Sequence, residues 1–227
     1  MYRARVKICG VTRAEDARMA SEVGADAVGM IFHPPSRRNI SIDRGREIIG
    51  AIGPFVTPVG VFVDAATEKI ASVASALGLH VVQLHGHEPA KQAAELSKLG
   101  LRVIKALRVD DLLEGELEAW RTEMARVGPV LAGIVLETGS TAQSGGSGVP
   151  NDFRAIRRHQ QAGHFASLPP MIVAGGLSPE TVEEVVRTLQ PWGVDVSSGV
   201  EGSYGIKSPG KVEAFVRGVR KGADAKE

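Results

Sequence analysis

Residues 170–197 read PMIVAGGLSPETVEEVVRTLQPWGVDVS and contain one strand–helix–strand unit. The apolar runs Pro170–Ala174 and Gly193–Ser197 predict two strands, because continuous Val, Ile and Leu runs are typical of strands buried on both faces. Between them, Ser178 followed by Pro179 predicts the start of an amphipathic helix, with a capping residue before proline at the first helical position. A helix in this place makes the two strands parallel.

The same unit recurs along the chain. Six further apolar runs precede this one, at Arg5–Cys9, Asp26–Phe32, Thr57–Val63, His80–Leu84, Leu101–Leu107 and Val130–Glu137. The units average about 28 residues, which is the length that a strand and its crossover helix need. Eight consecutive units predict the α/β class and a single-domain (β/α)8 TIM barrel over residues 1–220, with a doubly wound open sheet as the alternative. The small and charged residues 221–227 predict a frayed tail.

Composition narrows the classes of partner. The 27 basic and 26 acidic residues leave a formal net charge of +1, so we expect no nucleic-acid partner and no anionic membrane surface. No apolar stretch approaches the length of a membrane span. The single cysteine excludes an intramolecular disulfide and fits a cytoplasmic location. We therefore expect a small molecule as the partner.

Three glycine-rich segments follow the last three predicted strands, at residues 145–148, 175–176 and 197–199. In a (β/α)8 barrel the loops after strands seven and eight commonly bind phosphate, because glycines let backbone N–H groups approach the oxygens. The predicted phosphate contacts are Gly146, Gly148, Gly175, Gly176, Ser198 and Gly199. The sequence holds no P-loop motif, so a nucleoside triphosphate is not indicated.

Several motifs together resemble one family. They are VKICGVTRAEDA at 6–17, FHPPSRRNIS at 32–41, VVQLHGHE at 81–88, IVAGGLSPETV at 172–182 and GVDVSSGVEGSYGIKSP at 193–209. In this order, and over nearly the whole chain, they resemble the phosphoribosylanthranilate isomerases. The resemblance implies an intramolecular aldose–ketose isomerase of tryptophan biosynthesis, acting on a phosphosugar by an Amadori rearrangement. It implies no metal and no cofactor.

The implied reaction needs an acid and a base on opposite sides of the sugar. By resemblance, Cys9 at the end of the first strand is the general base, and Glu137 at the end of the sixth is the general acid. Lys7 shares the facing of Cys9, and such a cation is expected to lower the pKa of the thiol. Glu137 stands where the family has aspartate, one methylene shorter, and displacement by about an ångström can cost roughly 100-fold in rate.

Other residues are assigned to substrate binding by the same resemblance. Arg38 is expected to bind the anthranilate carboxylate through its guanidinium, although the neighbouring Arg37 replaces a family proline and is the alternative. His85 and Gln83 are expected near the aromatic ring of the substrate or near the acid. Asp195 is expected to orient the substrate, with a structural role in the barrel as the alternative. His85 and His87 could form a metal-binding pair, but no third ligand has convincing spacing, so a polar lining is favoured. The sequence identifies no partner for four histidines: His33, His80, His159 and His164.

Simpler roles stay open for the two catalytic candidates, since Cys9 can be a small buried hydrophobe and Glu137 can belong to a salt bridge. Two other functions also stay open. One is a non-catalytic phosphosugar-binding barrel, which the change to Glu137 would fit. The other is an isomerase of a related aminated phosphosugar, such as the histidine-pathway analogue, which would need a second phosphate site. The sequence does not choose between a monomer and a homodimer.

Overall fold

Eight parallel strands form a closed barrel in the computed structural model, which describes residues 2–138 and 153–224. Each strand pairs with its neighbour in chain order, and β1 closes the ring against β8, with Lys7 opposite Asp195. The strands are β1 (Arg5–Ile8), β2 (Ala27–Ile31), β3 (Thr57–Phe62), β4 (Val81–Leu84), β5 (Arg102–Arg108), β6 (Leu131–Glu137), β7 (Met171–Ala174) and β8 (Gly193–Val196). The predicted barrel is confirmed, and each predicted strand lies within one residue of its observed bounds.

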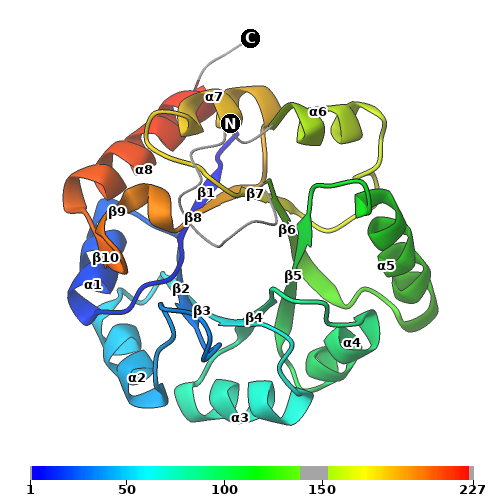
Figure 1. Cartoon of the computed structure of the whole chain (residues 1–227), viewed down its shortest axis with the longest axis horizontal. Coiled ribbons are helices and arrows are strands. Elements are labelled where there is room, and N and C mark those ends of the chain that lie inside the picture. Colours follow the sequence, from blue (N-terminus) through cyan, green and yellow to red (C-terminus); the bar gives the residue numbers. More distant parts are fainter. Residues whose placement is uncertain (1, 139–152, 225–227) are drawn as a thin grey trace.

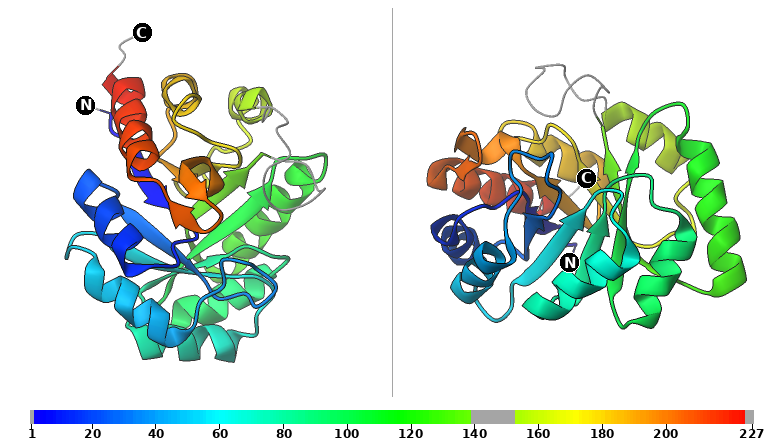
Figure 2. Two further views of the ribbon diagram at one scale, coloured as in Figure 1. Left: turned by 60° about the vertical axis from the view of Figure 1, so that its left-hand side comes forward. Right: turned by 60° about the horizontal axis from the view of Figure 1, so that its bottom comes forward.

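The helices surround the barrel as an outer layer, as Figure 1 and the two views of Figure 2 show. A short antiparallel hairpin follows β8 and lies beside α8. The helices are α1 (Ala14–Val23), α2 (Ile42–Ala51), α3 (Thr67–Leu77), α4 (Ala90–Lys98), α5 (Leu113–Val127), α6 (Phe153–Gln161), α7 (Val182–Leu189) and α8 (Pro209–Asp224). The 3-10 turn η1 (Ser198–Val200) leads into the hairpin of β9 (Glu201–Ser203) and β10 (Ile206–Lys207). Among the described helices, none is long and apolar enough to cross a membrane.

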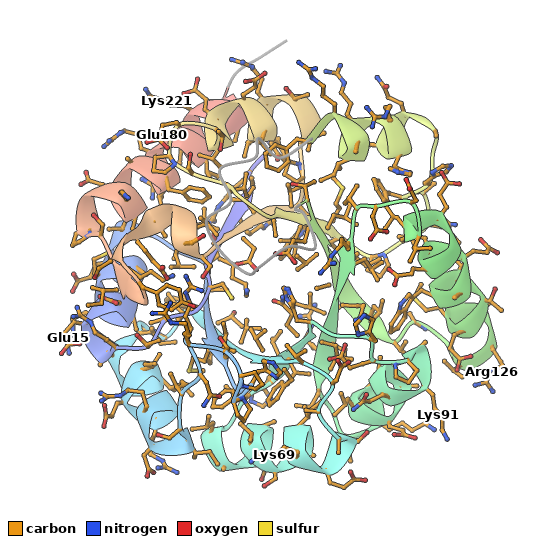
Figure 3. All side chains as sticks on the ribbon, in the orientation of Figure 1. Glu15, Lys69, Lys91, Arg126, Glu180 and Lys221 are labelled. Carbon is orange, nitrogen blue, oxygen red and sulfur yellow. The ribbon has the colours of Figure 1, made fainter. Side chains whose placement is uncertain are left out.

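Successive side chains of each strand point to opposite faces, so core residues and predicted site residues lie on different faces of the barrel wall. In β1, Val6 and Ile8 belong to the main apolar core, whereas Lys7 between them does not. In the same way Gln83 alternates with core residues of β4, and Asp195 alternates with core residues of β8. The buried polar side chains of the strands therefore share the face opposite to the helix layer. The labelled charged side chains of Figure 3 lie instead on the outer rim of the molecule.

The start of α7 differs from the prediction. The helix begins at Val182 with Thr181 as its N-cap, so Ser178 and Pro179 do not open it. The Ser178 carbonyl accepts the N–H of Thr181 at 3.2 Å, and its hydroxyl accepts the N–H of Glu180 at 3.3 Å. These bonds form a turn before the helix, because a serine side chain can satisfy backbone groups in a turn as well as at a cap.

The predicted frayed tail is wrong for residues 221–224, which continue α8. Gly222 is buried against α7, where an added Cβ would lie 2.5 Å from the carbonyl oxygen of Glu183. Packing against α7 thus keeps residues 221–224 helical, although their composition is small and charged. Residues 225–227 lie outside the described residues.

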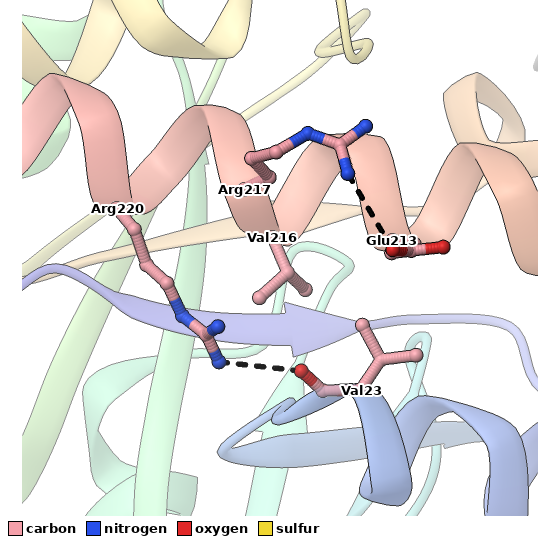
Figure 4. A pocket seen from close by; sticks show the side chains of 5 residues that line it. All are labelled: Val23, Glu213, Val216, Arg217 and Arg220. Atoms are coloured by element: carbon pink, nitrogen blue, oxygen red, sulfur yellow. Dashed lines mark hydrogen bonds and ion pairs between the residues drawn. The ribbon is translucent and has the colours of Figure 1, made fainter.

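A pocket of about 350 Å³ lies between α8 and the end of α1, and none of the residues that line it is a predicted site residue (Figure 4). Arg220 crosses it and donates to the carbonyl oxygen of Val23 at 3.3 Å, and Arg217 pairs with Glu213. The Arg220 bond satisfies a carbonyl at the last turn of α1, which is a role that cations commonly have at helix C-termini. This pocket therefore has a structural explanation.

Candidate active site

Cys9 directly follows β1 and is buried beside a buried ion pair. Lys7 Nζ lies 2.7 Å from Asp195 Oδ2, and the charge of Lys7 acts on the neighbouring Cys9 thiol. The neighbouring position on β2 must be small, because a Cβ on Gly29 would lie 2.8 Å from Cys9 Sγ. The structure thus brings together three of the predicted site residues.

The pKa values of this group differ from the expectation. Burial raises the pKa of the Cys9 thiol, and the nearby Lys7 only partly offsets that effect. The expected lowering by Lys7 is therefore not the net result, because loss of hydration disfavours the thiolate more strongly. Burial alone would lower the pKa of Lys7, but Asp195 and Cys9 together raise it above its ordinary value. Lys7 is thus held as a cation next to the thiol.

A second group of predicted residues forms a hydrogen-bonded chain from β4 to β6. The amide nitrogen of Gln83 lies 2.8 Å from His85 Nδ1, and His85 Nε2 lies 3.1 Å from Glu137 Oε2. Since the amide nitrogen can only donate, Nδ1 accepts and Nε2–H faces the carboxylate. The hydrogen bond from His85 lowers the pKa of Glu137. Glu137 keeps 38% of its side chain exposed, so its carboxyl group is accessible.

Sequence reasoning missed the pair that supports the loop after His85. Lys105 on β5 pairs with Glu88 at 2.9 Å, and both side chains are buried. Glu88 also accepts backbone N–H groups from Asp64 and Gly86, each at 2.9 Å. This pair ties the loop after β4 to β5 and to the end of β3. Glu88 ends a quoted motif and Lys105 lies on the fifth predicted strand, but no spacing rule links a lysine on one strand to a glutamate after another.

Arg38 is buried, and its guanidinium is bound in bidentate fashion by a residue that sequence reasoning also missed. Nε and Nη2 of Arg38 lie 2.8 Å from the two carboxylate oxygens of Glu201, while Nη1 lies 3.1 Å from the Tyr204 hydroxyl. Lys207 Nζ also lies 3.0 Å from Glu201. Burial would raise the pKa of Glu201, but Arg38 and Lys207 hold it at about 2. The hairpin after β8 therefore positions Arg38.

Arg37, the predicted alternative to Arg38, has a different environment. Its side chain is exposed on the loop after β2, and its guanidinium carbon lies 4.0 Å from the centre of the Tyr204 ring. The two arginines thus lie on the same tyrosine, and only Arg38 is bonded to Glu201.

The loops after β7 and β8 come into backbone contact, as the phosphate prediction requires. A Cβ on Gly199, in η1, would lie 1.9 Å from the carbonyl oxygen of Leu177, two residues after Gly175. Gly175 itself has φ +87° and packs on the backbone of Thr138 after β6. Glycine is required for these close approaches. The predicted contacts Gly176 and Ser198 lie in the same two loops, while Gly146 and Gly148 lie outside the described residues.

The two chemical groups of the site come from strands on different sides of the ring. The thiol follows β1 and the carboxylate ends β6, with β7 and β8 between them in the closed order. Both residues stand at the carboxyl ends of their strands, which is the end where TIM barrels carry active sites. A molecule bound between them would meet a thiol with a neighbouring ammonium on one side and a carboxyl–imidazole pair on the other. That arrangement can remove a proton at one atom and supply one at another.

Comparison with known proteins shows the family of this chain. The family model described as N-(5'phosphoribosyl)anthranilate (PRA) isomerase matches residues 6–218. The N-(5'-phosphoribosyl)anthranilate isomerase of Geotalea uraniireducens is 41% identical over 213 residues, covering 94% of this chain and 97% of the relative. The Pseudomonas paraeruginosa isomerase is 40% identical, with 97% of each chain covered. These matches confirm the resemblance that the motifs indicate.

Solved structures agree with this result. The phosphoribosyl anthranilate isomerase of Thermotoga maritima superposes with a TM-score of 0.80 at 36% identity, covering 96% of this chain and 98% of that one. Another structure of such an isomerase, in complex with reduced 1-(o-carboxyphenylamino)-1-deoxyribulose 5-phosphate, superposes with a TM-score of 0.77 at 34% identity and the same coverage.

Proposed function

The chain belongs to the N-(5'-phosphoribosyl)anthranilate isomerase family, and from that premise we propose that Cys9 and Glu137 are the base and the acid of its reaction. The chain isomerises N-(5'-phosphoribosyl)anthranilate in tryptophan biosynthesis. The product is the 1-amino-1-deoxyribulose phosphate that the Amadori rearrangement yields. The observation that carries the assignment is the position of a thiol and a carboxyl group at the ends of β1 and β6, each with a partner that controls its charge.

The acid acts first. Opening the furanose ring requires a proton on the ring oxygen as its bond to C1 breaks and an iminium forms. In this proposal Glu137 donates that proton, and the Nε2–H of His85 holds the carboxyl group in place. The glutamate side chain reaches His85 at 3.1 Å from its position on β6, so the carboxyl group has a defined hydrogen-bond partner.

The base then removes the proton from C2. The electron pair of that C–H bond forms the C1–C2 double bond of an enolamine, and the iminium nitrogen becomes an amine. In this proposal the Cys9 thiolate accepts the proton, and the ammonium of Lys7 stabilises the thiolate in a buried site. The enolamine tautomerises to the ketone by gaining a proton at C1 and losing the one on its oxygen.

The remaining residues bind and orient the substrate in this proposal. Arg38 meets the anthranilate carboxylate through its Nη1 end, which Glu201 does not occupy and which also donates to the Tyr204 hydroxyl. Asp195 fixes Lys7, and Gln83 fixes the tautomer of His85. The phosphate lies against the loops after β7 and β8, at Gly175, Gly176, Ser198 and Gly199. We also propose a cytoplasmic location, where a single cysteine stays reduced.

Neither alternative function has comparable support. A non-catalytic barrel would need no paired acid, and here Glu137 is held by His85 in a hydrogen-bonded chain. A related aminated phosphosugar is not favoured, because the curated relatives in the comparison share one activity.

The assignment is tested with purified Cys9→Ser and Glu137→Gln variants. Each should lower kcat by about 100-fold or more, since general acid or base catalysis contributes roughly 10²–10⁴ in rate. Circular dichroism should show an unchanged fold, and binding of the reduced product analogue should remain. A Glu213→Gln variant, changed on the outer face of α8, serves as the matched control and should keep full activity. Full activity in Cys9→Ser would refute the role of the thiol.

A further inference from the structure

Two histidines meet at the end of α6, on the outside of the barrel. His159 Nδ1 lies 2.9 Å from His164 Nδ1, although five residues separate them in the chain. The carboxylate of Glu114, in the first turn of α5, lies beside both nitrogens, with Oε1 at 3.7 Å from the first and 3.5 Å from the second. The three ligand atoms thus form a compact triangle between two helices that are neighbours in Figure 1.

The backbone at this helix end explains why the histidines converge. The N–H of His164 donates to the carbonyl of His159, and the N–H of Gly163 donates to the carbonyl of Gln160, each at 3.0 Å. With Gly163 at φ +78°, these bonds form a Schellman motif. In this motif the third residue from the end of the helix contacts the second residue after the C-cap, and both residues are usually apolar. Here both are histidines, so the sequence HQQAGH specifies a pair of imidazoles.

From this geometry we propose that Glu114, His159 and His164 bind a divalent transition metal ion, with Zn²⁺ as the best fit. A zinc ion with ligands at about 2.0–2.1 Å in a tetrahedron has ligand atoms about 3.3 Å apart. The three observed separations, 2.9, 3.5 and 3.7 Å, lie on both sides of that value. Two imidazoles and one carboxylate are a donor set that zinc takes in proteins, with the fourth position left to water.

The protonation of the pair is compatible with this proposal. Without metal, one Nδ1–H must donate to the other Nδ1 for the two nitrogens to lie so close. On metal binding, the donor imidazole moves its proton to Nε2, so that both Nδ1 lone pairs point to the ion and no charge change is required. The half-buried rings and the ring of Phe165 beside His159 shield the pair from solvent, while Glu114 supplies a negative charge.

The site would link α5 to the turn after α6. An independent contact already joins these segments, because Arg121 of α5 donates to the carbonyl oxygen of His164. The same guanidinium pairs with Glu118 at 3.2 Å, so its charge is balanced near the proposed ion. A bound metal would fasten this part of the outer helix layer and would take no part in the isomerisation. The proposal does not depend on the proposed function.

The test is Zn²⁺ binding by the full chain after chelator treatment and removal of the chelator. Isothermal titration should show one bound Zn²⁺ in wild type that is absent in His159→Ala/His164→Ala. Glu114→Gln should weaken binding by roughly 10-fold or more, on the order of the loss that partners of metal sites cause when removed. His80→Ala, which removes an exposed histidine elsewhere, is the matched control and should bind as wild type does.

A measurement of thermal stability keeps the test decisive. Zn²⁺ should raise the thermal midpoint of wild type, because an ion that binds the folded state stabilises it, and it should not raise that of His164→Gln. This single variant serves if the double variant does not fold. The proposal is overturned if wild type binds no Zn²⁺, or if the double variant binds it with unchanged affinity, which would place the ion elsewhere and leave the histidines as a hydrogen-bonded pair only.

Discussion

At the scale of single residues, burial and hydrogen bonding move the pKa values of the two catalytic candidates apart. The pKa of the Cys9 thiol is raised by burial, and the pKa of Glu137 is lowered by its hydrogen bond from His85. Near neutral pH the free enzyme therefore holds mostly a thiol and a carboxylate. The reactive form has a Cys9 thiolate and a protonated Glu137. It carries the same number of protons as the main form and is a minor species.

This distribution predicts the pH profile of kcat/KM. The profile should be a broad bell, because such a minor form has a constant population between the two pKa values and declines outside them. Its acid limb should lie below the ordinary range of glutamate, and its alkaline limb should lie above that of cysteine. His85→Asn removes the bond that lowers the pKa of Glu137, so the acid limb should move to higher pH while the alkaline limb stays.

The measurement is kcat/KM against pH for wild type and for His85→Asn. Activity of His85→Asn should also fall, since the carboxyl group loses the partner that places it. An acid limb that stays in place in this variant would show that another group titrates there. His87→Asn is the matched control, because that side chain is exposed and lies outside the Gln83–His85–Glu137 chain.

At the scale of elements, the loops after β7 and β8 depend on backbone contact. The Cα of Gly199 faces the carbonyl oxygen of Leu177 so closely that no side chain fits. Gly199→Ala should therefore lower the free energy of unfolding by about 1–3 kcal/mol, the usual cost of overpacking, and should raise KM by displacing the proposed phosphate loop. Urea denaturation and steady-state kinetics measure the two effects.

Gly210→Ala is the control for that substitution. Gly210 lies in the first turn of α8, and a Cβ there meets no atom within 4 Å. This change should leave stability unchanged or raise it slightly, because alanine favours helix over glycine by about 1 kcal/mol. Equal stability of Gly199→Ala and wild type would contradict the contact between the loops.

At the scale of the whole molecule, the barrel closes where β1 meets β8, and the Lys7–Asp195 pair lies across that seam. Both side chains are about 6% exposed, so removing one partner leaves a buried charge without its counter-ion. Asp195→Ala should lower the free energy of unfolding by about 3–5 kcal/mol. Equilibrium denaturation measures the loss.

An exposed pair provides the comparison. Glu213 and Arg217 form an ion pair one turn apart on α8, with more than half of each side chain exposed. Glu213→Ala should change stability by less than about 1 kcal/mol, since water screens exposed pairs. If Asp195→Ala cost no more than Glu213→Ala, the buried pair would not stabilise the closure of the barrel.

The sequence by itself determined the barrel and the family of this protein. Eight apolar runs in a regular rhythm predict eight parallel strands, because each strand is buried on both faces and needs a helix to return. The motifs around Cys9, His85 and Asp195 likewise lie at strand ends, so strand geometry alone predicts that they share one end of the barrel. Local patterns were sufficient to predict where a residue lies in the barrel whenever its position follows from its own strand.

Only the tertiary structure decided which side chains bind each other and which protons they carry. The Arg38–Glu201 pair spans 163 positions and the His85–Glu137 pair spans 52, and no local pattern encodes such separations. The net pKa of Cys9 depends on burial by many neighbours, whereas the sequence shows only the nearby cation. The pair of histidines after α6 depends on the αL conformation of Gly163 and on a glutamate from α5. Contacts and desolvation arise from the packed chain, and for that reason they became known only with the fold.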